Sequence, residues 1–219
     1  MTLRSEQLSE ALHEYVVGHS SPPDEILRDL AAETLAKLGD NAGMQIGPEQ
    51  GTFMTLLAEL IGAKRAVEVG TFTGYSSICV ARGLGAGGHL LCCDVSAEWT
   101  SIARRYWERA GLTDRIELKL GPGADTLAAL PAGTSFDFAF IDADKTGYVD
   151  YWDLIVPMIR PGGVLLVDNT LSHGRVVEPG EQGANVEGIR RFNDHALADD
   201  RVKLVLLPIG DGLTMARKL

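Results

Sequence analysis

From residue 64 onward, short apolar runs alternate with segments in which apolar residues recur every three or four positions. Apolar runs bounded by turn formers predict buried strands, and the periodic segments predict helices. The predicted strands cover residues 66–69, 89–93, 116–120, 138–141 and 164–167. One predicted helix starts at Tyr75, a short one lies near Asp125, and two longer ones cover 97–110 and 148–159. This alternation is typical of an α/β fold with a parallel, doubly wound sheet.

The end of the chain departs from the alternation. Two strand-like runs, 202–209 and 213–217, are joined by Gly-Asp-Gly at 210–212. A short glycine-rich turn of this kind predicts a hairpin, so these two strands are antiparallel and the sheet is mixed. Residues 170–184 predict an irregular loop on the substrate side, and no element is predicted for 185–201.

Three helical patterns precede the first strand, at 5–17, 24–38 and 48–61. The second starts with an acid and is followed by Gly39, which are typical helix boundaries. Between the second and third lies a loop, 40–47, whose turn formers would let it fold over a ligand. A chain of 219 residues is long enough to bury roughly 70% of its unfolded surface as one domain.

Composition narrows the function classes. The formal net charge of −10 and the pI near 4.9 argue against a nucleic-acid groove or an anionic membrane surface, because both need clustered Lys and Arg. Cys79, Cys92 and Cys93 lack metal-ligand spacing and are expected as reduced, packed thiols. The polar N-terminus carries no apolar stretch suited to a signal or a membrane span. We therefore expect a cytoplasmic protein that acts on small molecules.

The turn after the first strand, residues 70–76, is the first candidate ligand site. Gly70 and Gly74 permit close backbone approach, and the next helix start offers unpaired N–H groups. By itself the turn is also compatible with a plain strand–helix connection. Asp94 ends the next strand, where an acid can accept hydrogen bonds from ribose hydroxyls, so the pair predicts an adenosine-type ligand. Trp99 is interpreted chiefly as a packing residue, although it lies close enough to Asp94 to border an adenine pocket.

Glu68 is a carboxylate within the first apolar strand. A buried carboxylate is costly unless it is paired or lies near a polar ligand. Two interpretations stay open for this position: a ligand contact, or a buried acid that accepts hydrogen bonds from nearby backbone N–H groups.

Oxygen-bearing side chains follow two further strands. Asp142 ends the run 138–141, and Asp168 and Asn169 end the run 164–167. In parallel strands such ends share one edge of the sheet. An oxygen-only set suits Mg²⁺, Mn²⁺ or Ca²⁺ rather than zinc. Acids at strand ends also cap neighbouring helices, which is the alternative.

Asp144, Lys145 and His173 lie close to these acids in the sequence. A cation next to a lysine disfavours the charged ammonium, which would let Lys145 act as a base. The alternatives are a solvated surface lysine for Lys145 and, for Asp144, a helix cap or a partner of a site residue. His173 is expected as a solvated loop histidine.

Taken together, these motifs resemble the cation-dependent S-adenosylmethionine O-methyltransferases of the caffeoyl-CoA and catechol type. The residues that carry the resemblance are Met44, 68–76, Asp94, 142–145 and 168–170, and it extends over nearly the whole chain. It implies a Rossmann-like, seven-stranded class I methyltransferase sheet with a reversed last strand, and usually a homodimer. The whole chain, 1–219, is then one methyltransferase domain, with an N-terminal helical cap (1–62) and a Rossmann-like core (63–219).

The resemblance also assigns roles to residues. It implies cofactor contacts at Met44, Glu68, Gly70, Thr71, Gly74, Ser76, Asp94, Gly123, Asp142 and Tyr151. It makes Asp142, Asp168 and Asn169 ligands of a divalent cation, Mg²⁺ first and Mn²⁺ or Ca²⁺ as alternatives. Lys145 becomes the general base.

Two departures bear on the acceptor. Plant members of the family commonly carry an aromatic residue where Ser172 stands, and often a threonine where Ile46 stands. With an acidic chain as well, a free catechol-like small molecule is favoured over a CoA ester. The competing functions are an NAD(P)-dependent oxidoreductase, which would more usually show a three-glycine turn, and a non-catalytic adenosine-binding module.

Overall fold

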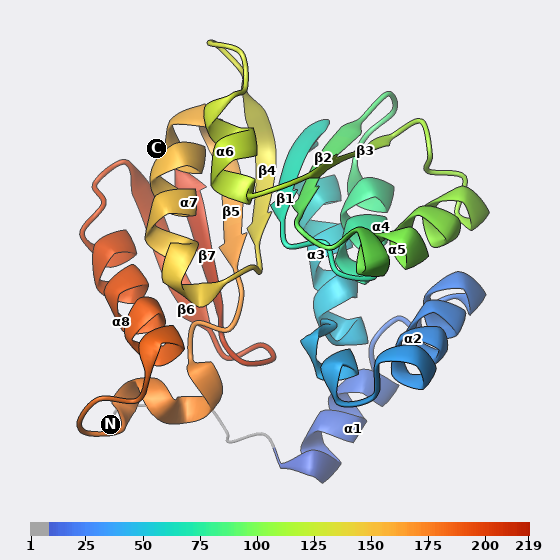
Figure 1. The fold of residues 1–219 in the computed structure, drawn as a ribbon, viewed down its shortest axis with the longest axis horizontal. Helices are drawn as coiled ribbons and strands as arrows, with labels where there is room; N and C mark the ends of the chain where they lie inside the picture. The colour runs from blue at the N-terminus through green and yellow to red at the C-terminus, as the bar shows by residue number, and fades with distance from the viewer. Residues whose placement is uncertain (1–8) are drawn as a thin grey trace.

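A computed structural model describes residues 9–219. Its centre is one seven-stranded sheet with the strand order β3-β2-β1-β4-β5-β7-β6. The strands are β1 (Arg65–Val69), β2 (His89–Asp94), β3 (Ile116–Leu120), β4 (Phe136–Ile141), β5 (Ile159–Val167), β6 (Val202–Leu207) and β7 (Leu213–Lys218). Helices cover both faces (Figure 1). This is the predicted α/β architecture, with helices ahead of the first strand.

The helices follow the chain in an order that fits the alternation. They are α1 (Glu10–Gly18), α2 (Glu25–Leu38), α3 (Pro48–Leu60), α4 (Tyr75–Gly83), α5 (Ala97–Arg109), α6 (Gly123–Ala128), α7 (Tyr148–Ile155) and α8 (Ala184–Leu197), with 3₁₀ segments η1 (Gly39–Met44), η2 (Lys145–Gly147), η3 (Val156–Met158) and η4 (Ser172–Val177). Within residues 9–219, no helix combines the length and the apolar content that a membrane crossing requires.

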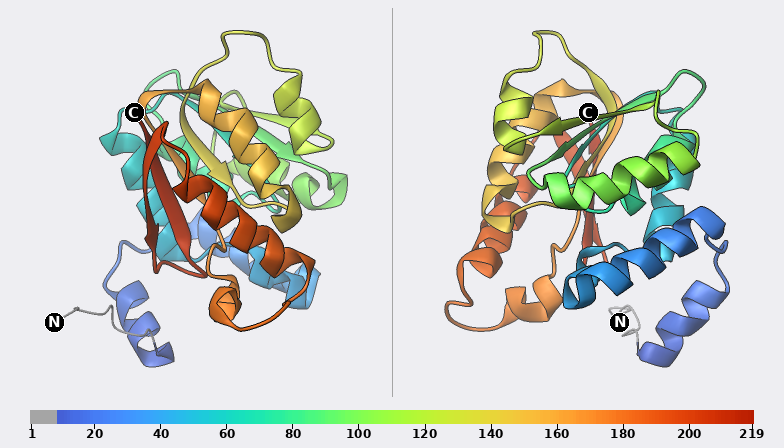
Figure 2. Two further views of the ribbon diagram at one scale, coloured as in Figure 1. Left: turned by 90° about the vertical axis from the view of Figure 1, so that its left-hand side faces the viewer. Right: turned by 45° about the vertical axis from the view of Figure 1, so that its right-hand side comes forward.

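Apolar side chains on both faces of the central strands explain the two helical layers. Helices α2–α5 bury residues such as Leu30, Met54 and Ile78 against one face, and α7 and α8 bury Trp152 and Phe192 against the other. Because β1, β4 and β5 are buried on both faces, their sequences are nearly continuous apolar runs. Figure 2 shows both layers from the side.

The C-terminal hairpin is confirmed. Strand β7 pairs antiparallel with β5 on one side and with β6 on the other, while β1 to β5 pair in parallel. This insertion of β7 next to β5 brings the turn at 208–212 to the same edge of the sheet as the end of β5. The hairpin therefore contributes to the site described below.

Several helix boundaries differ from the sequence-based expectation. The predicted helix 5–17 starts outside the described residues, and its described part is α1. The predicted helix 148–159 ends as α7 at Ile155, because Pro157 lacks the N–H that would continue it. Residues 170–184, expected as irregular, contain η4, and α8 occupies part of a stretch for which no element was predicted. The amphipathic pattern of α8, with Ile189 and Phe192 buried, was the available signal.

The three cysteines are free and buried, as expected. Cys92 and Cys93 lie on β2, between β1 and the edge strand β3, and Cys79 lies on α4. Burial raises the pKa of the Cys79 thiol to about 12 and that of the Cys93 thiol to about 12. These thiols are therefore packing residues rather than nucleophiles.

Candidate active site

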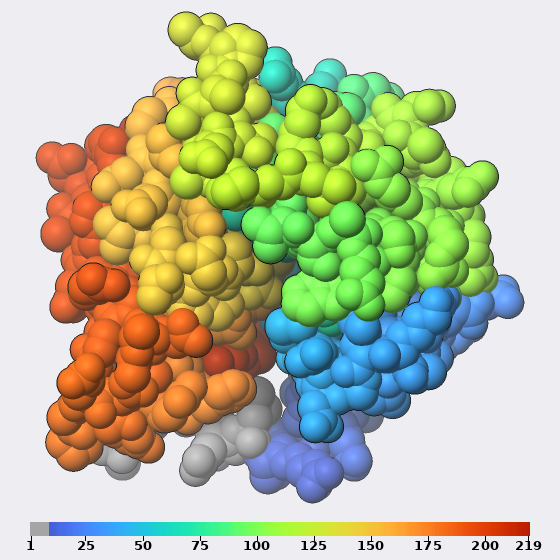
Figure 3. Space-filling view, viewed as in Figure 1, coloured from blue at the N-terminus to red at the C-terminus, as the bar shows by residue number. Residues whose placement is uncertain are grey.

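A cavity of about 770 Å³ lies at the carboxyl edge of the sheet. The ends of β1, β2, β4 and β5 form its floor, and η1, η4 and the β6–β7 turn contribute its walls. In the space-filling view the surface is hollowed between the blue N-terminal helices and the yellow and orange segments of the C-terminal half (Figure 3). Open α/β sheets bind ligands at this edge.

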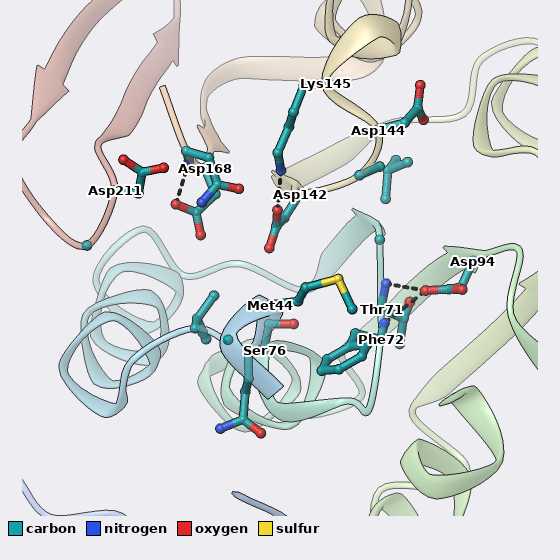
Figure 4. A pocket seen from close by; sticks show the side chains of 18 of the residues that line it. Met44, Thr71, Phe72, Ser76, Asp94, Asp142, Asp144, Lys145, Asp168 and Asp211 are labelled. Atoms are coloured by element: carbon teal, nitrogen blue, oxygen red, sulfur yellow. Dashed lines mark hydrogen bonds and ion pairs between the residues drawn. The ribbon is translucent and has the colours of Figure 1, made fainter. Parts of the chain in front are cut away.

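Asp94 organises one end of the cavity. Its Oδ2 accepts hydrogen bonds from the backbone N–H groups of Thr71 and Phe72, both at 2.8 Å, and its Oδ1 accepts one from Ser96 N at 2.7 Å. The carboxylate at the end of β2 therefore holds the turn after β1 (Figure 4). Recognition of a ribose by Asp94 stays a prediction. The structure shows a second role for Asp94, which is to hold the turn after β1 in place.

The turn needs glycine at two positions. Gly70 has φ 91°, and a Cβ there would lie 1.9 Å from the carbonyl oxygen of Asp142. Gly74 also has φ 91°, and a Cβ there would lie 2.7 Å from Ala103 Cβ. The first glycine lets the ends of β1 and β4 touch, and the second lets α4 start close to α5.

Glu68 is fully buried beneath this turn. Its Oε2 accepts a hydrogen bond from the Cys92 thiol at 3.3 Å, and its Oε1 has no partner among the described residues. The interpretation that it accepts backbone N–H groups is wrong. Burial raises the pKa of Glu68 to about 8. Glu68 does not itself line the cavity, whereas the next residues, Val69, Gly70 and Thr71, do. An unpartnered buried oxygen next to them is suited to a polar ligand.

An apolar wall stands beside Asp94. The rings of Phe72 and Trp99 meet edge to face, with centroids 5.2 Å apart, and both residues line the cavity. Met44 on η1 is partly exposed and points into the cavity from the N-terminal side (Figure 4). This wall could hold a flat heterocycle.

Gly123 and Tyr151 complete this end of the cavity. A Cβ at Gly123 would lie 2.7 Å from Val69 Cγ1, so α6 starts directly against β1. The Tyr151 hydroxyl donates to Asp144 Oδ1 at 2.5 Å. Asp144 is thus a partner of a site residue and makes no side-chain cap at η2.

Asp142, Asp168 and Lys145 form the other end. Lys145 Nζ donates to Asp142 Oδ1 at 2.8 Å and to the Tyr148 hydroxyl at 2.7 Å. Asp168 is buried; burial and the nearby negative charge of Asp142 raise its pKa to about 7. Lys145 is paired and mostly enclosed, so the alternative of a solvated surface lysine is wrong.

Backbone strain is concentrated around the cavity. Within residues 9–219, four non-glycine residues have positive φ: Phe72, Asn169, Ser172 and His173. All four line the cavity. Such conformations are unfavourable for residues with a Cβ and are held by surrounding contacts, which is typical of functional sites. The His173 side chain is largely exposed, as expected.

The oxygen-bearing side chains fit a divalent cation. Asp142, Asp168 and Asn169 all line the cavity, and neither aspartate caps a described helix. Two nearby carboxylates with only one lysine leave negative charge that a cation would neutralise. Residues 9–219 contain no group of three or more His, Cys, Asp or Glu suited to hold a metal ion. The predicted set has only two such residues, because its third member is the amide Asn169.

A family model described as O-methyltransferase matches residues 17–219. This chain belongs to the O-methyltransferase family. It is an S-adenosylmethionine-dependent O-methyltransferase, and neither competing function is supported. Its seven-stranded sheet with a reversed last strand is the class I methyltransferase fold.

Curated relatives and solved structures agree with the family. A Dictyostelium discoideum protein named probable caffeoyl-CoA O-methyltransferase 2 is 40% identical, over 97% of this chain and 94% of its own. The mouse catechol O-methyltransferase domain-containing protein 1 is 38% identical, over 95% and 80%. A Bacillus cereus O-methyltransferase solved in complex with SAH superposes with a TM-score of 0.87 at 34% identity, covering 95% of this chain and 97% of that one.

Three residues of this methyltransferase site were missed by sequence reasoning: Gln50, Tyr148 and Asp211. All three contact a predicted site residue or the segment that follows one. Gln50 Nε2 donates to Asp168 Oδ2 at 2.7 Å, the Tyr148 hydroxyl accepts from Lys145, and Asp211 accepts from the backbone N–H of His173. Only Tyr148 could have been found from the sequence. It follows Lys145 by three positions, and residues at that spacing lie on the same face of a helix.

Proposed function

We propose that this methyltransferase transfers a methyl group from S-adenosylmethionine to one hydroxyl of a catechol-like small molecule, with a divalent cation, Mg²⁺ first, at Asp142, Asp168 and Asn169. The observation that carries the proposal is that the glycine turn and the oxygen-bearing cluster line one cavity, with Lys145 among the oxygens. Mn²⁺ or Ca²⁺ would suit the same oxygen donors.

The cofactor is proposed to occupy the end of the cavity next to Asp94. The proposed contacts are Met44, Glu68, Gly70, Thr71, Gly74, Ser76, Asp94, Gly123, Asp142 and Tyr151. The unpartnered buried oxygens Glu68 Oε1 and Thr71 Oγ1 and the apolar wall of Phe72 support this placement, because a nucleoside offers polar edges and a flat apolar face. A Streptomyces achromogenes O-methyltransferase solved in complex with SAM, 30% identical with a TM-score of 0.86 and covering 95% of this chain and 96% of that one, supports the cofactor.

Lys145 is the proposed general base. When bound, the cation would favour ionisation of an acceptor hydroxyl and S-adenosylmethionine would supply the methyl group. Lys145 Nζ lies 2.8 Å from Asp142 Oδ1, so it stands beside a proposed cation ligand. The Tyr148 hydroxyl, fully buried, holds Nζ from the other side at 2.7 Å. This arrangement suits removal of a proton from a hydroxyl held at the acid cluster.

A free catechol is favoured over a CoA ester. Acidic side chains outnumber basic ones in the lining of the cavity. The acids are Asp94, Asp142, Asp144, Asp168 and Asp211, and the bases are Lys145 and Arg175. This negative surplus suits a neutral diol and a cation rather than a diphosphate. The names of the relatives, which include a probable caffeoyl-CoA O-methyltransferase and a catechol O-methyltransferase domain-containing protein, are compatible with either acceptor.

The test is turnover with a panel of small catechols and of catechol-bearing CoA esters. The protein is incubated with S-adenosylmethionine and Mg²⁺, Mn²⁺ or EDTA, and S-adenosylhomocysteine is measured. Turnover that EDTA abolishes and metal restores supports the proposal. Turnover indifferent to EDTA would assign Asp142, Asp168 and Asn169 to structure, and turnover with CoA esters alone would overturn the free acceptor.

We also propose a homodimer in the cytoplasm. Exposed apolar side chains on the edge strand β6, Val205 and Leu206, and on α3, Leu56 and Leu60, support a surface that a second copy covers. The free cysteines support a reducing compartment. Light scattering on the purified protein tests the dimer, and a monomeric mass would contradict it.

A further inference from the structure

The segment that follows the proposed cation ligand Asn169 is a strained turn. Asn169, Ser172 and His173 have φ of 58°, 47° and 54°, and Gly174 follows with φ 80°. Asn169, Ser172 and His173 all line the cavity. Left-handed backbone is unfavourable for side-chain-bearing residues, so contacts from outside the turn must hold it.

Those contacts come mainly from the β6–β7 hairpin, and Asn193 Nδ2 on α8 also donates to the carbonyl oxygen of Thr170 at 2.9 Å. Thr170 N donates to the carbonyl oxygen of Gly212 at 3.0 Å, and Leu171 N donates to that of Asp211 at 2.9 Å. His173 N donates to Asp211 Oδ1 at 2.5 Å. Within residues 9–219, Asp211 is the one side chain that accepts an N–H from residues 170–174. The His173 ring also lies near it, with Nε2 3.7 Å from Asp211 Oδ2.

The hairpin itself does not depend on this carboxylate. Gly212 N donates to the carbonyl oxygen of Ile209 at 2.9 Å, which closes the turn through backbone alone. Although Asp211 stands at the tip of a hairpin, its side chain is only 14% exposed. In Figure 4 the Asp211 carboxylate lies on the same side of the cavity as Asp168. A carboxylate so placed serves the neighbouring turn rather than its own.

We propose that Asp211 is a positioning residue of the acceptor side. It holds the strained turn and so fixes where Asn169, Ser172 and His173 face the acceptor. The consequence for acceptor binding rests on the proposed function. The stabilisation of the turn by Asp211 does not depend on any ligand. It can therefore be tested separately from the effect on acceptor binding.

Three variants separate this role from general stability. Asp211→Ala removes the acceptor of the His173 N–H, whereas Asp211→Asn keeps an oxygen that can accept it. Asp24→Ala is the matched control, because Asp24 Oδ1 also accepts one backbone N–H, from Leu27 at 3.0 Å, at the start of α2 and outside the cavity. Hydrogen exchange of residues 169–174 and acceptor kinetics are measured for each.

We expect Asp211→Ala to speed exchange at 169–174 by about tenfold or more. We expect its KM for 3,4-dihydroxybenzoate to rise by about tenfold while affinity for S-adenosylhomocysteine stays within about twofold. Asp211→Asn should return the exchange rate and the KM most of the way to the wild-type values. Asp24→Ala should change neither the exchange rate at 169–174 nor the KM. Unchanged exchange in Asp211→Ala overturns the proposal, as does a loss of cofactor affinity equal to that of the acceptor. If the wild-type protein methylates none of the catechol panel, the proposed function fails and exchange alone decides the role of Asp211.

Discussion

The side-chain amide of Gln50 donates a 2.7 Å hydrogen bond to Oδ2 of Asp168 across 118 positions of sequence. Both residues are buried, Gln50 on α3 and Asp168 at the end of β5. Asp168 Oδ1 accepts from Asn169 N at 2.7 Å, so both carboxylate oxygens are oriented by donors. Through Gln50, the N-terminal helices take part in placing a proposed cation ligand.

Gln50→Leu is expected to weaken cation binding by about tenfold or more, because residues that orient a metal ligand contribute on that scale. The change removes the donor to Asp168 and keeps a similar side-chain volume. Mn²⁺ binding to the purified protein, followed by electron paramagnetic resonance, measures the effect without turnover. Gln182→Leu is the control, since Gln182 Nε2 donates only to the carbonyl oxygen of Pro179 in an exposed loop. Equal Mn²⁺ affinity in wild type and Gln50→Leu would contradict the role.

Lys145→Ala is expected to lower kcat by about a hundredfold or more, the usual scale for a lost acid–base group, and to leave cofactor affinity unchanged. Lys119→Ala is the matched control. Lys119 makes a comparable pair with Glu117, at 2.7 Å, but on β3 and away from the cavity. Initial rates and calorimetric titration with S-adenosylhomocysteine give the two quantities. A Lys145→Ala protein with wild-type kcat would exclude Lys145 as the base.

Asp94→Ala is expected to weaken S-adenosylhomocysteine binding by about tenfold or more, because charge-assisted bonds to two backbone N–H groups and any bond to the ligand are lost together. The released N–H groups belong to Thr71 and Phe72, whose turn borders the cavity. Calorimetry measures the affinity. Asp153→Ala, which removes a surface pair with His195, should bind like wild type. Wild-type affinity in Asp94→Ala would place the cofactor elsewhere.

Glu68 is expected to make the cofactor-free protein less stable as the pH rises. Its pKa is about 8 in the folded state and about 4.3 when unfolded, so the folded protein holds a proton that the unfolded chain has released. The contribution of Glu68 to the free energy of unfolding should therefore fall by about 1.4 kcal/mol per pH unit between about pH 5 and pH 8, with little further loss from this group above pH 8.

Urea denaturation of cofactor-free protein between pH 5 and pH 8 measures this slope. Glu68→Gln keeps the shape and cannot ionise, so its slope should be about 1.4 kcal/mol per pH unit shallower than that of the wild type. The slope due to Asp168, whose pKa is also raised, to about 7, remains in both proteins. Glu108→Gln, on the exposed face of α5, should keep the wild-type slope. Parallel slopes for wild type and Glu68→Gln would show that Glu68 is charged in the folded protein.

Some features of this methyltransferase could be predicted because they depend only on residues close together in the sequence. Strands 66–69 and 138–141 were predictable because apolar runs of that length, bounded by turn formers, suit strands buried on both faces. The acids that end β4 and β5 were predictable as neighbours, since parallel strands end at one edge. The missed helix α8 shows the limit, because no element was predicted for 185–201 although that stretch carries an amphipathic pattern.

The order of the elements and the chemical types at the strand ends follow from residues that are neighbours along the chain. The tertiary structure alone decided which side chains support them: Gln50 behind Asp168, Asp211 beneath the turn after Asn169, and Cys92 rather than backbone amides at Glu68. Strand periodicity and strand-end chemistry depend on neighbours along the chain. A hydrogen bond between α3 and β5, or between a hairpin and a strained turn, depends on packing that brings distant segments together, and no local pattern records it.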